Sequence, residues 1–131
     1  MKAKTILAAS VMIAAATAIS AADQAPAAPH VTEVITVDVG ANMQKFRDMS
    51  RRIDGILKGL QFAGKVRYYE TTWAGTSAGH VIVTVEYPSL VILAQSVAKL
   101  NASPDFQKWE GDMQASGIKV LSESLITELR M

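Results

Sequence analysis

His80 is the residue of this sequence best suited to acid–base chemistry, because an imidazole titrates near neutral pH. Glu86 and Asp38 carry carboxylates that can orient an imidazole or stabilise its protonated form. These three residues are therefore the candidate catalytic set. A single strand histidine beside a glycine turn is also typical of the rim of a site, where it takes no part in chemistry.

Several neighbouring side chains are better suited to binding than to catalysis. Trp73 can stack on a planar ligand or fill an interface between two subunits. Arg67 can hold a ligand carboxylate or pair with Glu86, and the ion pair is the simpler interpretation. The predicted ligand-binding set is Arg67, Tyr69, Trp73, His80, Thr84 and Glu86.

The sequence lacks the residue patterns of several common site classes. It has no cysteine, which excludes disulfides, thiolate metal ligands and a cysteine nucleophile. Its two histidines, His30 and His80, form no recognisable zinc-binding pattern with the carboxylates. No complete phosphate-binding loop or dinucleotide-binding glycine pattern occurs. We therefore expect neither a metal nor a cofactor.

Two strands on either side of a glycine-rich turn must position these side chains. Residues 65–73 and 80–87 are rich in β-branched and aromatic residues, and residues 74–79 join them. A symmetric turn places Trp73 opposite His80, and the same register places the predicted binding residues on one face. The valines at the alternate positions then face the core. A slip of one residue would exchange the two faces.

The rest of the sequence predicts further strands and helices around this hairpin. Residues 30–39 alternate as a strand, with Asp38 on the polar side. Apolar residues at steps of three and four then predict an amphipathic helix over 43–60, with Asn42 as its N-cap.

After the hairpin, a mostly apolar helix is expected over 90–100. Ser103 and Pro104 are typical of the start of a further helical segment. Residues 118–129 predict the last strand, in which a bulge near Ser122 would switch side chains from one face to the other.

The order of these elements, β-α-β-β-α-β, is that of the ferredoxin-like α+β fold. Two helices would cover one face of an antiparallel sheet and leave the other face to water, a ligand or a second subunit. We predict a single domain of this type over residues 30–131.

The N-terminal segment has the layout of an export signal. Lys2 and Lys4 precede an apolar stretch over residues 5–19, and small residues follow up to Ala22. The stretch is shorter than a membrane-spanning helix requires. We predict a signal peptide over residues 1–22 and secretion into the periplasm of a bacterium; an uncleaved membrane anchor is the alternative.

A tether rich in proline and alanine, residues 23–29, follows the signal peptide. The chain has 13 basic and 12 acidic residues, and removal of the two lysines in the signal lowers its net charge from +1 to about −1. A balance of this kind predicts neither a nucleic-acid partner nor, after cleavage, a membrane partner.

The element order and two segments together resemble the dimeric α/β-barrel superfamily, which includes NIPSNAP-like proteins, antibiotic-biosynthesis monooxygenases and stress-responsive barrel proteins. The segments are 79–88 (Gly-His-Val-Ile-Val-Thr-Val-Glu-Tyr-Pro) and 103–109 (Ser-Pro-Asp-Phe-Gln-Lys-Trp). The resemblance extends from His30 to Arg130. It implies a homodimer in which two open sheet faces form a barrel that encloses a small molecule.

The catalytic residues of the monooxygenases in that superfamily, an Asn, a Trp and a His or Tyr, do not carry over. The first strand has no Asn, and Trp109 shares its helix face with the apolar residues Phe106 and Met113. His80 belongs to a strand. The resemblance therefore implies a fold but does not indicate which reaction, if any, the protein catalyses.

We expect an exported small-molecule-binding dimeric barrel protein whose substrate the sequence does not indicate. One alternative is a cofactor-independent monooxygenase or isomerase that acts in the barrel cavity. A second is a non-catalytic structural dimer. A cavity of at least ~300 Å³ lined by the residues of the open face would favour binding, and a face filled by its partner would favour the structural dimer.

Overall fold

In a computed structural model, the described residues are 29–72, 75, 79–129 and 131. This part of the chain contains four strands and three helices. They are β1 (Val31–Asp38), α2 (Met43–Gly59), β2 (Lys65–Glu70), β3 (Val81–Tyr87), α3 (Leu90–Asn101), α4 (Pro104–Ala115) and β4 (Lys119–Thr127). The predicted signal peptide, most of the tether, and Trp73 lie outside the described residues.

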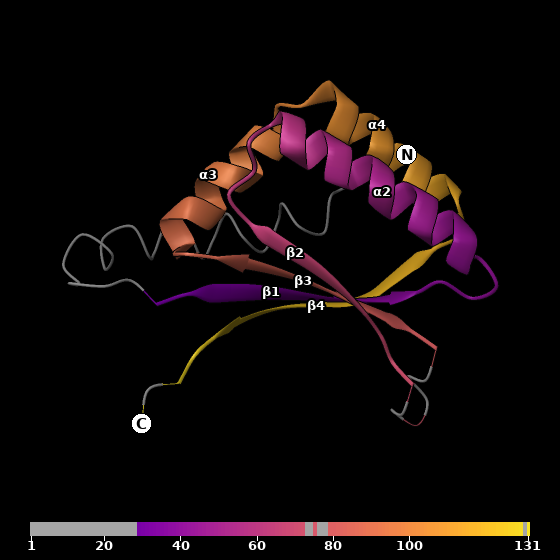
Figure 1. Ribbon diagram of the computed structural model, residues 1–131, viewed down its shortest axis with the longest axis horizontal. Helices are drawn as coiled ribbons and strands as arrows, with labels where there is room; N and C mark the ends of the chain where they lie inside the picture. Colours follow the sequence, from indigo (N-terminus) through magenta and orange to yellow (C-terminus); the bar gives the residue numbers. More distant parts are fainter. Residues whose placement is uncertain (1–28, 73–74, 76–78, 130) are drawn as a thin grey trace.

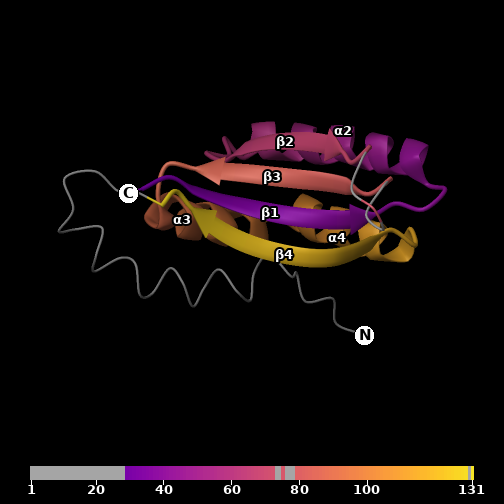
Figure 2. The ribbon, with the colours of Figure 1, turned by 90° about the horizontal axis from the view of Figure 1, so that it is seen from below.

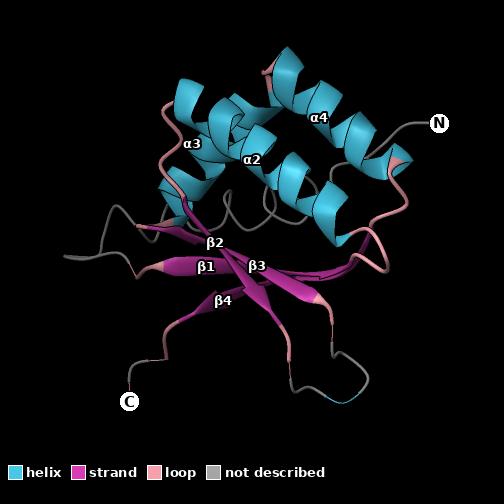
Figure 3. Ribbon diagram, turned by 45° about the vertical axis from the view of Figure 1, so that its right-hand side comes forward, coloured by secondary structure: helices cyan, strands magenta, loops and turns pink. Residues whose placement is uncertain are grey.

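The four strands form one antiparallel sheet in the order β2-β3-β1-β4. All three helices lie on the same side of this sheet, as Figures 1 and 2 show. The α+β class predicted from the sequence is confirmed, and the arrangement is compatible with a ferredoxin-like fold. The sequence predicted two helices on the sheet, whereas the described chain has three, because the second helical region breaks at Ser103 into α3 and α4. The opposite side of the sheet carries no helix of the described chain (Figure 3).

The two C-terminal helices begin where local sequence predicts. Ser103 Oγ accepts a hydrogen bond from Phe106 N at 3.2 Å, and Ser89 Oγ accepts one from Ile92 N at 3.3 Å. Each serine thereby satisfies a backbone N–H that the first helical turn leaves free. Asn42 precedes α2 as predicted, but its side chain makes no capping hydrogen bond.

The register of the β2–β3 hairpin differs from the prediction by two residues. Arg67 pairs with Thr84 rather than with Glu86. Thr71, not Trp73, is opposite His80, because Thr71 N donates to the His80 carbonyl at 2.9 Å. Side chains on a strand alternate with a period of two, so a shift of two leaves every residue on its predicted face.

The predicted bulge in the last strand is present. Thr36 pairs with Ser122, whereas Val37 pairs with Val120, so that Leu121 is an extra residue on β4. A single extra residue moves the following side chains to the opposite face. Glu123 therefore faces the helices, as Val120 does on the other side of the bulge.

The core lies between the sheet and the helices. The helix-facing valines Val81 and Val85 are buried, as predicted, against residues of α2 and α3 such as Phe46 and Leu93. Helix α4 packs against both α2 and α3. None of the helices in the described ranges is long and apolar enough to cross a lipid bilayer.

Candidate functional site

The open face of the sheet carries most of the side chains predicted to bind a ligand. Arg67 Nη1 lies 3.5 Å from Glu86 Oε2, so the predicted ion pair is present. His30 Nδ1 lies 3.4 Å from the other oxygen of the same carboxylate. Thr84 lies on the inner strand β3 and Tyr69 on the edge strand β2. Trp73, another member of the predicted binding set, falls outside the described residues.

The candidate catalytic residues divide between two ends of the open face. His80 and Glu86 belong to the same extended segment, and six residues of a strand span roughly 20 Å. Glu86 therefore cannot orient the His80 imidazole within one subunit. Asp38 and His80 occupy the positions that follow the last register pair of β1 and β3. The Asp38 carboxylate accepts a hydrogen bond from Gly40 N at 2.9 Å, which stabilises the turn after β1.

The His80 ring is partly enclosed. Its Nδ1 is buried and has no hydrogen-bond partner among the described residues. Its backbone carbonyl accepts hydrogen bonds from Thr71 N and Thr71 Oγ1, both at 2.9 Å. The hairpin therefore fixes the His80 backbone, while no described carboxylate is bonded to its ring.

A cavity of about 250 Å³ lies on the other side of the sheet, between the strands and the helices. Every helix and strand of the described chain contributes to its walls, which are mainly aliphatic and aromatic. None of the predicted site residues that the structure describes lines it. Its aromatic lining residues are Phe46, Phe62, Tyr68, Tyr87, Phe106 and Trp109.

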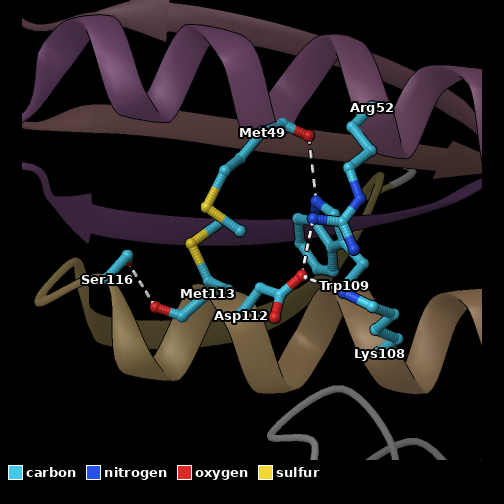
Figure 4. Close-up of polar contacts among 7 residues, drawn as sticks. All are labelled: Met49, Arg52, Lys108, Trp109, Asp112, Met113 and Ser116. Atoms are coloured by element: carbon cyan, nitrogen blue, oxygen red, sulfur yellow. Dashed lines mark hydrogen bonds and ion pairs between the residues drawn. The ribbon is translucent and has the colours of Figure 1, made fainter.

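Contacts between α2 and α4 hold the helical wall of this cavity (Figure 4). Trp109 Nε1 donates a hydrogen bond to the Met49 carbonyl at 2.9 Å and so links the two helices. Nearby, Asp112 accepts from Lys108 Nζ at 3.0 Å and pairs with Arg52 Nη1 at 2.7 Å. These two cations lower the pKa of the Asp112 carboxyl. The link places the Trp109 ring over the cavity, which is consistent with the packing role predicted for it.

Glu33 lies on the strand side of the cavity and is 1 % exposed. It projects from β1 on the same face as Val31 and Val37, both of which belong to the apolar core. Neither carboxyl oxygen of Glu33 has a hydrogen-bond partner in the described part of the chain. A buried polar group in this state is costly, and it is therefore the most unusual feature of the core.

Glu123 of β4 is the neighbour of this carboxyl. Glu33 pairs with Leu125, so Glu123 is diagonally adjacent on the same face. Burial, followed by hydrogen bonding to Glu123 and its like charge, raises the pKa of Glu33 from 4.5 to about 9. Two ionised carboxylates only accept hydrogen bonds, whereas one proton between them allows one to donate to the other. The two carboxyls therefore form an acid pair that retains a proton at neutral pH.

Tyrosines on the neighbouring strands complete the polar surroundings. Burial, followed by the charges of Glu33 and Glu123, raises the pKa of Tyr87 well above its ordinary value. The pKa of Tyr68 is also raised, by burial and then by Asp54, to which Tyr68 Oη donates a hydrogen bond at 2.9 Å. Both phenols therefore keep their protons at neutral pH.

All the charged side chains that line the cavity are acidic. Its charged lining residues are Glu33, Glu110 and Glu123, and no lysine, arginine or histidine lines it. None of the three carboxylates takes part in an ion pair among the described residues. The negative charge of the acid pair is thus not compensated by the part of the chain that the structure describes.

Sequence reasoning missed Glu33, although a signal for it exists. The first strand alternates, and its apolar positions Val31, Ile35 and Val37 share one face with Glu33. An acidic residue in the middle of a core-facing row is rare unless it is paired or functional. Glu123 was harder to identify, because its face depends on the bulge in β4.

The described ranges contain no group of three or more His, Cys, Asp or Glu side chains arranged to hold a metal ion. The chemistry that the cavity offers is hydrogen bonding and proton exchange at the acid pair, next to an apolar surface. Comparison of the sequence with protein-family models and with curated proteins finds no match.

Proposed function

We propose that this protein binds a small, largely apolar molecule in the cavity between its sheet and its helices. The observation that carries the proposal is an aromatic-walled space of about 250 Å³ with an unpartnered, buried carboxyl at its edge. Cavities of about 150 Å³ hold benzene, and drug-sized ligands occupy roughly 300–1,000 Å³. A single ring with a short substituent is the size that fits.

Export to the periplasm and assembly as a dimeric barrel belong to the same proposal. The open face supports the dimer, because Tyr69 and Ile126 are half exposed on it, at 48 % and 52 %. Hydrophobic side chains exposed in this way favour association. In this arrangement the Arg67–Glu86 pair lies at the subunit interface, and the ligand lies behind the sheet in each subunit.

A second candidate function is an isomerase that needs no cofactor. The acid pair favours it over a monooxygenase, because a carboxylic acid beside a carboxylate can donate one proton and accept another. Such an enzyme would exchange a carbon-bound proton of its ligand with solvent. Deuterium uptake into the ligand from D₂O, followed by NMR, would distinguish it from a binding protein.

The binding proposal predicts that filling the cavity abolishes binding. Val83 faces the cavity from β3, and the substitution Val83→Phe places a ring in it. We expect binding of 2-phenylethanol, measured by titration calorimetry, to weaken at least about tenfold, which corresponds to roughly 1.4 kcal/mol.

The matched control is Ala98→Phe, which adds the same ring at an exposed position on α3 away from the cavity. It should bind the probe as the unmodified protein does. Circular dichroism establishes that both variants are folded. Equal binding by both variants would place the ligand outside the cavity, and no binding by the unmodified protein would favour the structural dimer.

A further inference from the structure

We infer that the cavity selects a ligand with a protonated amine on a small aromatic or aliphatic body, held by the carboxyls of Glu33 and Glu123. This inference rests on the proposed function and names the chemical class of its ligand. It assigns a binding role to Glu33 and Glu123, whose burial the fold does not otherwise explain.

The first argument is the state of the carboxyl oxygens. Three of them, both from Glu33 and Oε2 of Glu123, are buried without a hydrogen-bond partner among the described residues. The proton held by the pair satisfies at most one oxygen of each carboxyl, so at least one buried oxygen of Glu33 is left without a donor, which is unfavourable. An ammonium group carries up to three N–H donors and no acceptor, so it complements this set of acceptors.

The second argument is charge. Two adjacent carboxyls with one proton carry one negative charge, and the cavity lining contains a further carboxylate, Glu110, but no cation. An isolated buried charge is strongly unfavourable unless a charge of opposite sign lies beside it. An anionic ligand would add to the repulsion, and a neutral one would leave it unrelieved. A cationic ligand removes it.

The third argument separates an organic cation from a metal ion. Calcium takes six to eight oxygen ligands and magnesium needs a nearly ideal octahedron, whereas the acid pair offers two carboxyls beside apolar walls. An organic ammonium fits the same charge with fewer oxygen partners. Its apolar body would contact the aromatic side chains of the cavity, whose faces also attract cations.

The test compares three probes that share one ring and differ in the charge of the polar group: 2-phenylethylamine, 2-phenylethanol and phenylacetate. Each is titrated into the unmodified chain by calorimetry at neutral pH. We expect the amine to bind at least about tenfold more tightly than the alcohol, and phenylacetate to bind most weakly of the three.

The variant Glu33→Gln/Glu123→Gln keeps the shape of both side chains and removes the charge of the pair. We expect its amine-to-alcohol preference to fall to about one while its affinity for the alcohol is retained, which also shows that the cavity is intact. Glu128→Gln is the matched control, because Glu128 is exposed and follows β4 outside the cavity. It should keep the full preference.

The outcomes separate the inference from the proposed function. If the amine and the alcohol bind equally well, or the double variant keeps the preference, the inference is overturned while the binding function stands. A preference for phenylacetate would overturn it as well. If none of the three probes binds the folded protein, both the inference and the proposed function fail.

Discussion

At the scale of single residues, burial away from water changes the acid–base behaviour of a side chain more than its residue type does. His80 is the titratable residue that sequence favours, yet no described carboxylate is bonded to its ring. Glu33, an ordinary acid by type, is perturbed because the fold removes its water and places Glu123 beside it. The position of the perturbed carboxyl in this fold therefore depends on burial and not on residue type alone.

The raised pKa of Glu33 predicts that stability falls as pH rises. In the unfolded chain this carboxyl loses its proton near its ordinary value of 4.5, whereas in the folded chain it keeps the proton up to about 9. Between these pH values the unfolded state binds fewer protons, so the free energy of unfolding decreases with pH. Glutamine mimics the protonated acid and removes this dependence.

Relative to the unmodified chain, we expect Glu33→Gln to gain roughly 4 kcal/mol in the free energy of unfolding between pH 5 and pH 8, about 1.4 kcal/mol for each pH unit. Urea unfolding at several pH values measures this difference. Glu110 and Tyr87 also face the cavity and remain in both proteins, so their contributions largely cancel, whereas Glu123 loses its coupling to Glu33 in the variant and is part of the measured difference. A pH profile in Glu33→Gln as steep as that of the unmodified chain would contradict the assignment, and Glu128→Gln should show no change in slope.

At the scale of elements, close approach at Gly64 controls how β2 enters the sheet. A Cβ atom at this position would lie 2.5 Å from Phe62 Cε1, 2.7 Å from Val85 Cγ1 and 2.9 Å from Tyr87 Cε1. Phe62 and Tyr87 already pack edge to face at 5.8 Å, so neither ring can move away freely. The same two rings line the cavity.

We therefore expect Gly64→Ala to lower the free energy of unfolding by about 1–3 kcal/mol through overpacking. Gly111→Ala is the control. Gly111 lies within α4 with no atom within 4 Å of the added Cβ, so helix propensity should stabilise that variant by up to about 1 kcal/mol. Chemical denaturation of both variants measures the difference, and equal stability of the two would show that the approach at Gly64 is not restrictive.

The elements themselves could be predicted because their signals are local. Ser103 starts α4 through its own hydroxyl, and the steps of three and four in residues 43–60 directly specify a helix. The hairpin register could not be predicted, because it depends on where the chain leaves the sheet, at Thr71, and not on the side chains of the strands. The face of the sheet on which each side chain lies was nevertheless predicted correctly, because the register differs by two residues and side chains alternate with a period of two.

The cavity could not be predicted, because it depends on how the helices pack above the sheet. Trp109 and Met49 link α4 to α2, and this contact holds the two helices together over the cavity. The sequence showed Trp109 on an apolar helix face but not which helix it would meet. The candidate site was therefore expected on the open face, and the enclosed space lies on the covered one.

At the scale of the whole molecule, the two faces of the sheet have different roles. The covered face holds the core and the cavity, while the open face carries an ion pair between β2 and β3 and half-exposed apolar side chains. Association through the open face would bury those side chains without closing the cavity. Ligand binding and dimer formation are therefore separable properties of this fold.

The dimer proposal predicts that one charge on the open face produces a monomer. Ile126 pairs with Thr32 on that face and is 52 % exposed, so Ile126→Lys places an ammonium in the proposed interface. Leu129→Lys is the control, because Leu129 is 81 % exposed and follows β4. Native mass spectrometry of protein recovered from the periplasmic fraction should show dimers of the unmodified chain and of Leu129→Lys, and monomers of Ile126→Lys.

The same spectra give the chain mass, which for cleavage after Ala22 corresponds to a start at Asp23. A monomeric unmodified protein would reject the barrel, and because the cavity lies within one subunit, that result would leave the binding proposal unchanged.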